Sequence, residues 1–564
     1  MASIMDLYPS SLTADDVRHL ARRAGFGISP EAAAALVSAY GGDAQNTVNA
    51  WVDGTGLDAT VFNSALASAD PVTEPGATGS NGGTDVAATP GPHPYLVGGA
   101  NTWRNSLGRG QAYLAFRMQY DPFAFTQRMA LFLHNLFATG WTKVDNLSLM
   151  LNQWDTFVAH GRDVFTDLLV QVSKDPAMCY WLDSVRNNAA GTRTPNENYA
   201  REVMELYSLG VDNGYSQADI TNLAVGLAGW SFVVAPADVV TNPSNPDDQW
   251  VARGTFAIYD GSAATAGYKR WDLNDLGANL PNMRRLADIS FLGGTFPGAS
   301  PTQGEEAIRS IPTRRASGSV PPNCATFLAT RLLRTFVTTQ FSAQDVTDVA
   351  NMIDVAGYDL RAIMKTLLAS SYFYANRFAL VEGPVSWAVR AARALGYALP
   401  TSGTPDASRF PAWALVSGSF ENMGMKLLDP NGPNGWKEDV YWLNSNTMRY
   451  RTRFAAAVAL QETYSTDLGD GNKQYTLFPT DVEGWFPTPP ASPDALLSRL
   501  VDLLQPAAIP LAVQASWLDA LFPSDGSGNP IFNGASWAAG NARDRQAARS
   551  LAFLVLCSPS GQLY

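Results

Sequence analysis

The spacing of apolar and polar residues along this chain predicts a protein built mainly from α-helices. Ile220, Leu223, Ala224, Leu227 and Ala228 recur at intervals of three and four residues, which places them on one face of a helix. The same periodicity predicts further helices over residues 123–137, 147–172, 194–209, 323–341, 343–356, 359–374, 383–396, 492–505 and 541–557.

Polar residues with short side chains mark where several of these helices begin. Thr13 and Ser216 are each followed three residues later by an aspartate, the pattern of a capping box. Ser29 precedes a proline, which suits the first position of a helix. In the helix over 194–209, Thr194 is expected as the N-cap, with Glu197 closing a capping box.

Three segments depart from the helical pattern. Residues 70–94 are rich in Gly, Pro, Thr and Asp, and indicate a flexible surface insertion. Short apolar runs at 232–234 and 255–259 predict strands among Pro- and Asn-rich loops. Residues 429–446 are rich in Gly, Asn and Trp and read as a loop.

These patterns predict a mainly α fold, in which a large multi-helix domain carries a small β/loop insertion and long Gly/Pro-rich loops. We expect five parts within one integrated domain. They are an N-terminal helical part (1–69), the flexible insertion (70–94), a central helical core (95–231), the β/loop-rich insertion (232–322) and a C-terminal helical part (323–564).

Composition narrows the classes of function. Among 564 residues only 16% are charged, the net charge is −12 and the mean hydropathy is −0.08, which is typical of a globular acidic protein. Nucleic acid is not expected as a partner, because neutralising phosphates requires clustered Lys and Arg. The sequence has no run of about 18 apolar residues, so no transmembrane segment is predicted. No signal peptide is visible, and the localisation is unknown, with export or the cell surface as candidates.

Motifs for common cofactors and nucleophiles are missing from the sequence. It holds no Gly-x-Ser-x-Gly, no phosphate-binding Gly-x-x-x-x-Gly-Lys and no His-Glu-x-x-His. Cys179, Cys324 and Cys557 lie far apart and form no Cys-x-x-Cys pair, which excludes a zinc ribbon. We therefore expect no cofactor.

The helix over 194–209 concentrates charged residues on one face. Glu197, Arg201 and Glu205 are spaced four residues apart, so they can form a ladder of ion pairs on a solvated surface. Alternatively they line a cleft, where Arg201 keeps one carboxylate ionised and burial raises the pKa of another, with Glu202 as a further candidate. Such a split pair of carboxylates is what acid/base hydrolysis of a glycosidic bond requires.

Amide and indole side chains provide candidate substrate contacts. Asn196 and Asn198 flank Glu197 and could orient a sugar or a water molecule. Trp436 and Trp442, like Trp230, offer flat faces of the kind that stack on sugars. The alternative is that the two tryptophans of the 429–446 segment are buried anchors that hold this loop against the helices.

His134 is a third kind of candidate. It lies in a strongly apolar run, where a histidine either makes hydrogen bonds within the core or serves as a ligand or base. With only four histidines in the chain, a three-histidine metal site is hard to build. A metal site that combines His134 with a glutamate is the remaining form of this hypothesis.

Several stretches together resemble the bacterial "domain of unknown function 1800" proteins (DUF1800). The resemblance extends from about residue 15 to the end of the chain. The stretches that carry it are His19–Gly27, Arg128–Met129, His134–Asn135, Asp175–Met178, Pro195–Gly210, Gly214–Asp219, Gly229–Trp230, Met423–Gly424, Gly435–Trp436, Trp442–Asn444 and Ser558–Pro559. The resemblance implies a largely helical fold, no assigned activity, and a sulfatase-like companion protein as a partner.

The sequence also departs from the pattern of the family. Where relatives have His-Asn-His-Phe, this chain has leucine at position 136, and Met425 replaces a glutamine. A His-Asp-x-Gly-x-Lys stretch of relatives appears here as residues 284–289, without the histidine. If those residues bind metal or transfer protons in relatives, that role is altered here.

Three hypotheses follow. The first is a carbohydrate-active hydrolase acting on a polysaccharide, with Glu197, Glu205 and Glu202 as acid/base candidates and Arg201 tuning their pKa values. The second is a non-catalytic surface or assembly protein that docks the sulfatase-like companion. The third is a metal-dependent enzyme that uses His134.

Overall fold

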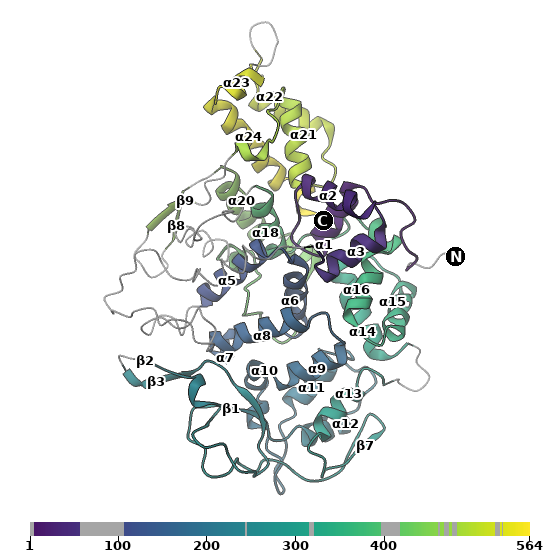
Figure 1. Ribbon diagram of the computed structural model, residues 1–564, viewed down its shortest axis with the longest axis vertical. Helices are drawn as coiled ribbons and strands as arrows, with labels where there is room; N and C mark the ends of the chain where they lie inside the picture. Colours follow the sequence, from purple (N-terminus) through teal and green to yellow (C-terminus); the bar gives the residue numbers. More distant parts are fainter. Residues whose placement is uncertain are drawn as a thin grey trace.

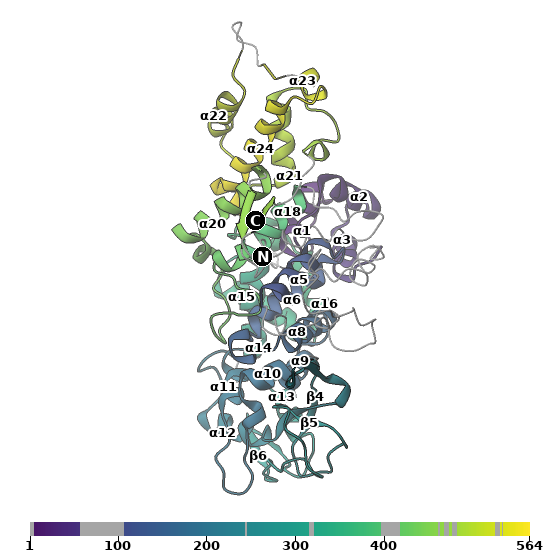
Figure 2. The ribbon, with the colours of Figure 1, turned by 90° about the vertical axis from the view of Figure 1, so that its left-hand side faces the viewer.

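The computed structural model describes residues 5–56, 107–242, 245–314, 321–395, 418–460, 463–466, 473–476, 482–524, 531–532 and 534–564. The predicted insertion at 70–94 lies outside these residues. Figures 1 and 2 show a molecule longer than it is wide, with α21–α24 at one end and the strands β1–β7 at the other. Helices α6, α8 and α18 lie between these two ends (Figure 1).

The prediction of a mainly helical fold is confirmed. In the N-terminal half, the α-helices are α1 (Ala14–Arg23), α2 (Pro30–Tyr40), α3 (Ala44–Asp53), α5 (Leu107–Tyr120), α6 (Ala124–Leu136), α7 (Trp141–Val144), α8 (Leu147–His160), α9 (Phe165–Lys174), α10 (Pro176–Trp181), α11 (Asn198–Glu205) and α12 (Gln217–Gly226). In the C-terminal half they are α13 (Gln303–Ser310), α14 (Asn323–Leu332), α15 (Ala343–Val355), α16 (Leu360–Leu368), α17 (Ser371–Ala375), α18 (Pro384–Ala394), α20 (Ser445–Ala455), α21 (Pro493–Leu504), α22 (Leu511–Leu521), α23 (Gly534–Ala538) and α24 (Ala542–Cys557).

Shorter helical segments and small antiparallel sheets complete the described chain. The 3-10 segments are η2 (Ser184–Arg186), η3 (Pro236–Asp238), η6 (Asp439–Trp442), η8 (Glu483–Trp485) and η9 (Pro559–Gln562), and the π-helical turns are η4 (Leu333–Val337) and η7 (Ala456–Leu460). The strands are β1 (Trp230–Val234), β2 (Val239–Asn242), β3 (Asn245–Val251), β4 (Thr255–Ile258), β5 (Lys269–Arg270), β6 (Ile289–Phe291), β7 (Gly294–Phe296), β8 (Thr463–Thr466) and β9 (Lys473–Thr476). They form a β4-β1-β5 sheet and the pairs β2-β3, β6-β7 and β8-β9.

The predicted caps of three helices are confirmed. Thr13 and Ser216 each form a complete capping box, with Asp16 and Asp219 respectively. The side chain of Ser29 accepts a hydrogen bond at the start of α2. These bonds satisfy backbone N–H groups that have no partner within the first turn.

The predicted start of the acidic helix was wrong. Helix α11 begins at Asn198, not at Thr194, and no side chain caps it. The reason is a turn just before it. The Asn196 side chain accepts a bond from the backbone N–H of Asn198 (2.9 Å), and the Asn196 N–H donates to Asn187 (2.9 Å). In this turn the Asn196 side chain accepts the hydrogen bond that a backbone carbonyl would accept in a helix. The residues before Asn198 are therefore held outside the helix.

Buried apolar side chains from α1 to α24 form one connected core cluster. Buried arginines lie within it, and several converge on one carboxylate. Glu382 is fully buried, and its Oε2 accepts a hydrogen bond from Arg390 Nε (2.8 Å) and lies 3.8 Å from Arg22. Its backbone carbonyl accepts a bond from Arg451 (2.6 Å), and its N–H donates to the carbonyl of Gln562 (2.8 Å). Glu382 thus joins α1, α18, α20 and η9.

Replacing Glu382 by Gln should destabilise the protein strongly. The variant keeps the shape of the side chain but leaves the guanidinium groups of Arg390 and Arg22 without their shared counter-charge, which costs about 3–5 kcal/mol in a buried site. Urea unfolding followed by circular dichroism measures this. Glu421→Gln is the control, because Glu421 pairs with Lys426 on the surface, where the loss is about 0–1 kcal/mol. Equal unfolding free energies for the two variants would contradict this role of Glu382.

Candidate functional site

The charged residues of α11 form the ion-pair ladder that their spacing allows. Arg201 lies 3.2 Å from Glu197 and 3.4 Å from Glu205, measured between guanidinium nitrogen and carboxylate oxygen. These side chains are 19–36% exposed. Glu197 also accepts hydrogen bonds from Thr221 Oγ1 (2.6 Å) and Gln217 Nε2 (2.8 Å), so it fastens α11 to α12. The ladder therefore contributes to the packing of these two helices.

The pKa values of two glutamates on α11 move in opposite directions. The hydroxyl of Thr221 and the neighbouring amide and guanidinium groups lower the pKa of Glu197. Burial, followed by the charge of Glu205, raises the pKa of Glu202, which is half-buried. The sequence offered such a split as an alternative for residues that line a cleft, and that alternative stays a prediction.

Trp230 and the α11 residues lie apart from the other candidates. Trp230 belongs to β1, is 4% exposed, and packs edge-on against Phe256 with the ammonium group of Lys174 over its ring. Its face is therefore covered. Asn196 and Asn198 serve the turn before α11. Four cavities in the described part of the chain have no α11 candidate in their lining.

His134, Trp436 and Trp442, by contrast, lie near one another between α6 and the 425–443 segment. His134 is buried, and its Nε2 accepts a hydrogen bond from the backbone N–H of Leu428 (3.1 Å). Its ring packs edge-on against Trp436, with ring centres 5.2 Å apart. Burial lowers the pKa of His134 to about 3, so this imidazole is neutral near pH 7. His134 supports the loop and does not face the cavity.

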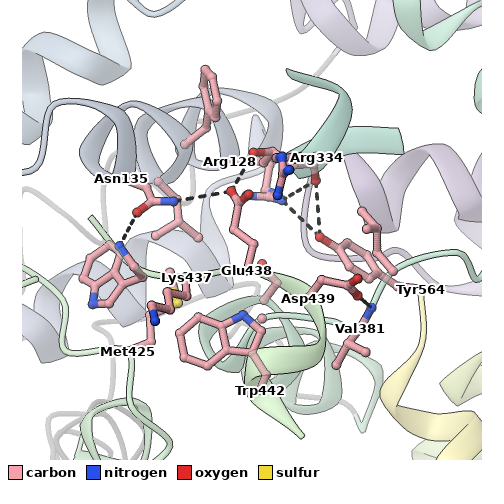
Figure 3. Close-up of a pocket in the computed structure, with 17 residues that line it drawn as sticks. Arg128, Asn135, Arg334, Val381, Met425, Lys437, Glu438, Asp439, Trp442 and Tyr564 are labelled. Carbon is pink, nitrogen blue, oxygen red and sulfur yellow. Dashed lines mark hydrogen bonds between the residues drawn. The ribbon is translucent and has the colours of Figure 1, made fainter. Parts of the chain in front are cut away.

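Figure 3 shows the cavity that these elements enclose. It occupies about 520 Å³ together with its open mouth, and about 60 Å³ of this space admits the centre of a water molecule. The interior is therefore wide enough for one polar substituent of a ligand. Its lining is Arg128, Leu131, Phe132, Asn135, Arg334, Thr335, Leu380, Val381, Gly383, Ser386, Met425, Trp436, Lys437, Glu438, Asp439, Trp442 and Tyr564. Trp436 and Trp442 are 4% and 8% exposed, so they act as walls and not as open stacking faces.

Glu438 is the carboxylate that this cavity leaves available. Its Oε1 accepts hydrogen bonds from Thr335 Oγ1 (3.0 Å) and Asn135 Nδ2 (3.5 Å). Its Oε2 makes no hydrogen bond with the described part of the chain. Asn135 is itself fixed, because its Oδ1 accepts a bond from the N–H of Trp436 (2.6 Å). One oxygen of Glu438 is thus held in place and the other is free for a ligand (Figure 3).

Asp439, the next residue, has a different role. Its Oδ1 accepts a hydrogen bond from the N–H of Val381 (2.8 Å), and its Oδ2 accepts one from Thr339 Oγ1 (2.6 Å). The backbone of Asp439 has a φ of 57°, a left-handed conformation that side-chain bonds of this kind can hold in place. Asp439 fixes the loop and leaves Glu438 as the carboxylate with an unbonded oxygen.

Cationic and hydroxyl groups complete the lining. Arg128 donates to the backbone carbonyls of Arg23 (3.1 Å) and Thr335 (3.3 Å) and to the hydroxyl of Tyr564 (3.4 Å). Arg334 is exposed and forms no ion pair within the described residues. The cavity therefore presents donors from Arg334 as well as a free carboxylate oxygen.

An aromatic ring lies beside the cavity. Tyr441 is 57% exposed, and the ammonium group of Lys437, which lines the cavity, lies 4.3 Å from the centre of its ring. Val440 and Leu443 are exposed next to it, at 65% and 45%. The exposed aromatic residue of the 429–446 segment is thus Tyr441, and not the two tryptophans that the sequence pointed to.

Gly435 shows how closely the loop approaches α6. Its φ is 71°, and a Cβ atom built on it would lie 2.3 Å from the backbone and side-chain oxygens of Asn135. A residue with a side chain at this position would displace the loop that carries Glu438. The loop that lines the cavity can therefore approach α6 this closely only with glycine at position 435.

The sequence did not single out Glu438, Arg334 or Tyr564. Glu438 lies within a stretch that was noted for its tryptophans, and its partners Asn135 and Thr335 are about 300 and 100 residues away in the chain. A glutamate followed directly by an aspartate between two tryptophans was the available signal.

Comparison with known families gives a match over nearly the whole chain. Residues 19–562 match the model of a family described as "Protein of unknown function (DUF1800)", so the chain belongs to that family. No curated protein and no solved structure matches the chain significantly. Within the described residues, no helix is long and apolar enough to cross a membrane, and no three His, Cys, Asp or Glu side chains are grouped to hold a metal ion.

The neutral state of His134 predicts how stability depends on pH. The pKa of His134 is lower in the folded protein than the unfolded value of about 6.5, so its stabilising contribution is complete above that pH and is lost as the pH falls towards 3. His134→Gln keeps an acceptor for the Leu428 N–H but does not titrate. Between pH 6.5 and 4.5, wild type should lose about 2–3 kcal/mol of unfolding free energy relative to this variant.

The comparison is made by urea unfolding at a series of pH values. Because both proteins share every other titrating group, the difference between them isolates His134. Parallel pH profiles for the two proteins would show that folding does not lower the pKa of His134, and would contradict the prediction.

Proposed function

We propose that this protein binds a saccharide by inserting one polar substituent into the cavity that Glu438 lines. The observation that carries the proposal is the state of the Glu438 carboxylate, which is held through Oε1 and unbonded at Oε2. A hydroxyl group of a sugar can donate to this oxygen and accept from a guanidinium group such as that of Arg334. A ligand rich in hydroxyl groups can therefore donate to the Glu438 oxygen and accept from the guanidinium group at the same time.

Two further features support a saccharide in particular. Much of the 520 Å³ lies in the open mouth of the cavity, so a ligand with one substituent inside the cavity would extend across that mouth. Tyr441 offers an exposed aromatic ring beside that mouth, and aromatic rings pack against the apolar faces of sugars. A longer saccharide can therefore use the cavity and the ring together.

The geometry favours binding over hydrolysis at this site. Acid/base cleavage of a glycosidic bond uses two carboxyl groups, which flank the bond at about 5–10 Å from each other. In this cavity both oxygens of Asp439 are engaged by Val381 and Thr339, which leaves Glu438 as the single carboxylate with an unbonded oxygen. We therefore propose that this cavity binds a saccharide and does not hydrolyse it.

The test is a binding titration with a panel of neutral and acidic oligosaccharides. Wild type should bind at least one of them. Glu438→Gln keeps the acceptor for Thr335 and Asn135 but removes the negative charge, and should bind at least about tenfold more weakly, the loss of one charge-assisted hydrogen bond. Glu205→Gln on α11 is the matched control and should bind like wild type.

Two outcomes would overturn the proposal. One is the absence of binding to every saccharide of the panel by a folded wild-type protein. The other is a loss of affinity in Glu205→Gln as large as that in Glu438→Gln.

Hydrolysis at α11 is the second candidate, because the environments of Glu197 and Glu202 separate their pKa values. A general acid requires a raised pKa, as Glu202 has, and its partner a lowered one, as Glu197 has. If α11 is catalytic, Glu202→Gln abolishes release of reducing ends from a polysaccharide that wild type degrades, while Glu438→Gln lowers the affinity and leaves turnover at saturation. Unchanged turnover in Glu202→Gln would remove this candidate.

A further inference from the structure

A second cavity lies on the other side of Glu382, between the turn before α2, the end of α18 and the end of α21. It occupies about 710 Å³ together with its open mouth, and about 260 Å³ of this space admits the centre of a water molecule. Its described lining contains two arginines, Arg390 and Arg393, and no carboxylate. The remaining lining residues are Gly27, Ile28, Ser29, Ala32, Gln119, Ala394, Leu503, Leu504 and Gln505.

Arg393 forms no direct ion pair with a described carboxylate, although the charge of Asp121 acts on it from a greater distance. Its Nη1 donates to the backbone carbonyls of Met118 and Gln119 (both 3.1 Å), at the C-terminal end of α5. No ion pair joins it to any described acidic residue, and the rest of its guanidinium group makes no hydrogen bond with the described chain. Burial lowers its pKa to about 10, so it is still charged near pH 7. Its remaining N–H groups are donors that have no acceptor among the described residues.

Arg390 belongs to the group of buried arginines around Glu382 and also lines this cavity. Its donors are engaged by Glu382 and by the carbonyls of Leu504 (2.7 Å) and Gly561 (3.3 Å). Glu382 also faces Arg22, and its backbone holds Arg451. Two guanidinium groups thus face the Glu382 carboxylate and a third bonds to the Glu382 backbone, so positive charge exceeds negative charge among these residues. A buried excess of this kind is stabilised by an anion.

We propose that the cavity between α2, α18 and α21 binds a tetrahedral oxyanion, which is a phosphate or sulfate group, either free or as an ester on a saccharide. The guanidinium group of Arg393 supplies the direct hydrogen bonds, since its planar set of N–H donors matches such oxygens. Arg390 contributes charge. The N-terminal end of α2 lies at the wall through Ser29 and Ala32, and its dipole adds to the attraction. This site is independent of the Glu438 cavity.

The test is calorimetric titration of the full chain with inorganic phosphate and, separately, with glucose 6-phosphate, each in buffer of constant ionic strength set with chloride. Wild type should bind at least one of the two ligands. Binding of phosphate identifies the free anion, whereas binding of the sugar phosphate alone identifies an ester. Arg393→Gln should weaken binding at least tenfold, and Arg393→Lys, which keeps the charge, should weaken it less.

Arg393→Gln also removes the hydrogen bonds from Arg393 to α5, so a second variant tests the cavity while leaving those bonds in place. Ala32 is exposed and lines the cavity, so Ala32→Glu places a carboxylate at its wall without disturbing the core and should also weaken binding at least tenfold. Ala34→Glu adds the same charge to α2 at an exposed position outside the cavity and should bind like wild type. Failure of both ligands to bind, or equal weakening by the two alanine variants, overturns the proposal.

Discussion

The burial of one carboxylate among guanidinium groups joins the helices that enclose both candidate sites of this protein. Glu382 is fully enclosed, and its contacts with Arg390, Arg22 and Arg451 join helices from the beginning, middle and end of the chain. The residue before it, Val381, donates its N–H to Asp439. The same short segment therefore fixes both the helical framework and the loop that carries the candidate site. Because removal of one partner from a buried ion pair is costly, this arrangement has few alternatives.

Within that loop, neighbouring carboxylates have separate tasks because their hydrogen bonds differ. Both oxygens of Asp439 are used by the protein, which keeps the backbone in a left-handed conformation. Glu438 uses one oxygen and offers the other. The guanidinium group of Arg393, which bonds to two backbone carbonyls and to no described carboxylate, lines a second cavity. The two binding sites that we propose thus rest on polar groups that have unused donors or acceptors among the described residues, whereas the acidic face of α11 is largely satisfied by Arg201, Thr221 and Gln217.

Local sequence signals were enough to predict most helices and several of their starts, as Thr13 and Ser216 show. They failed where a distant partner decides the local structure. Helix α11 begins late because Asn196 bonds to Asn187 before the helix. Helices α20 and α22 were not predicted. Helix α20 has a mostly polar sequence, and α22 is apolar but has no buried residue, so neither shows a clear amphipathic period. For the site, sequence reasoning located the 436–442 stretch but favoured its tryptophans. The importance of Glu438 depends on contacts with α6 and η4, which no local pattern encodes.

The most direct test of the central claim is hydrogen–deuterium exchange of the wild-type protein with and without a saturating saccharide. If the Glu438 cavity is the binding site, exchange should slow in residues 435–443 and around Thr335, while residues 197–205 on α11 should exchange as in the free protein. Slower exchange confined to α11, with the 435–443 loop unaffected, would contradict the account. It would indicate that the saccharide binds at the acidic helix and not in the Glu438 cavity.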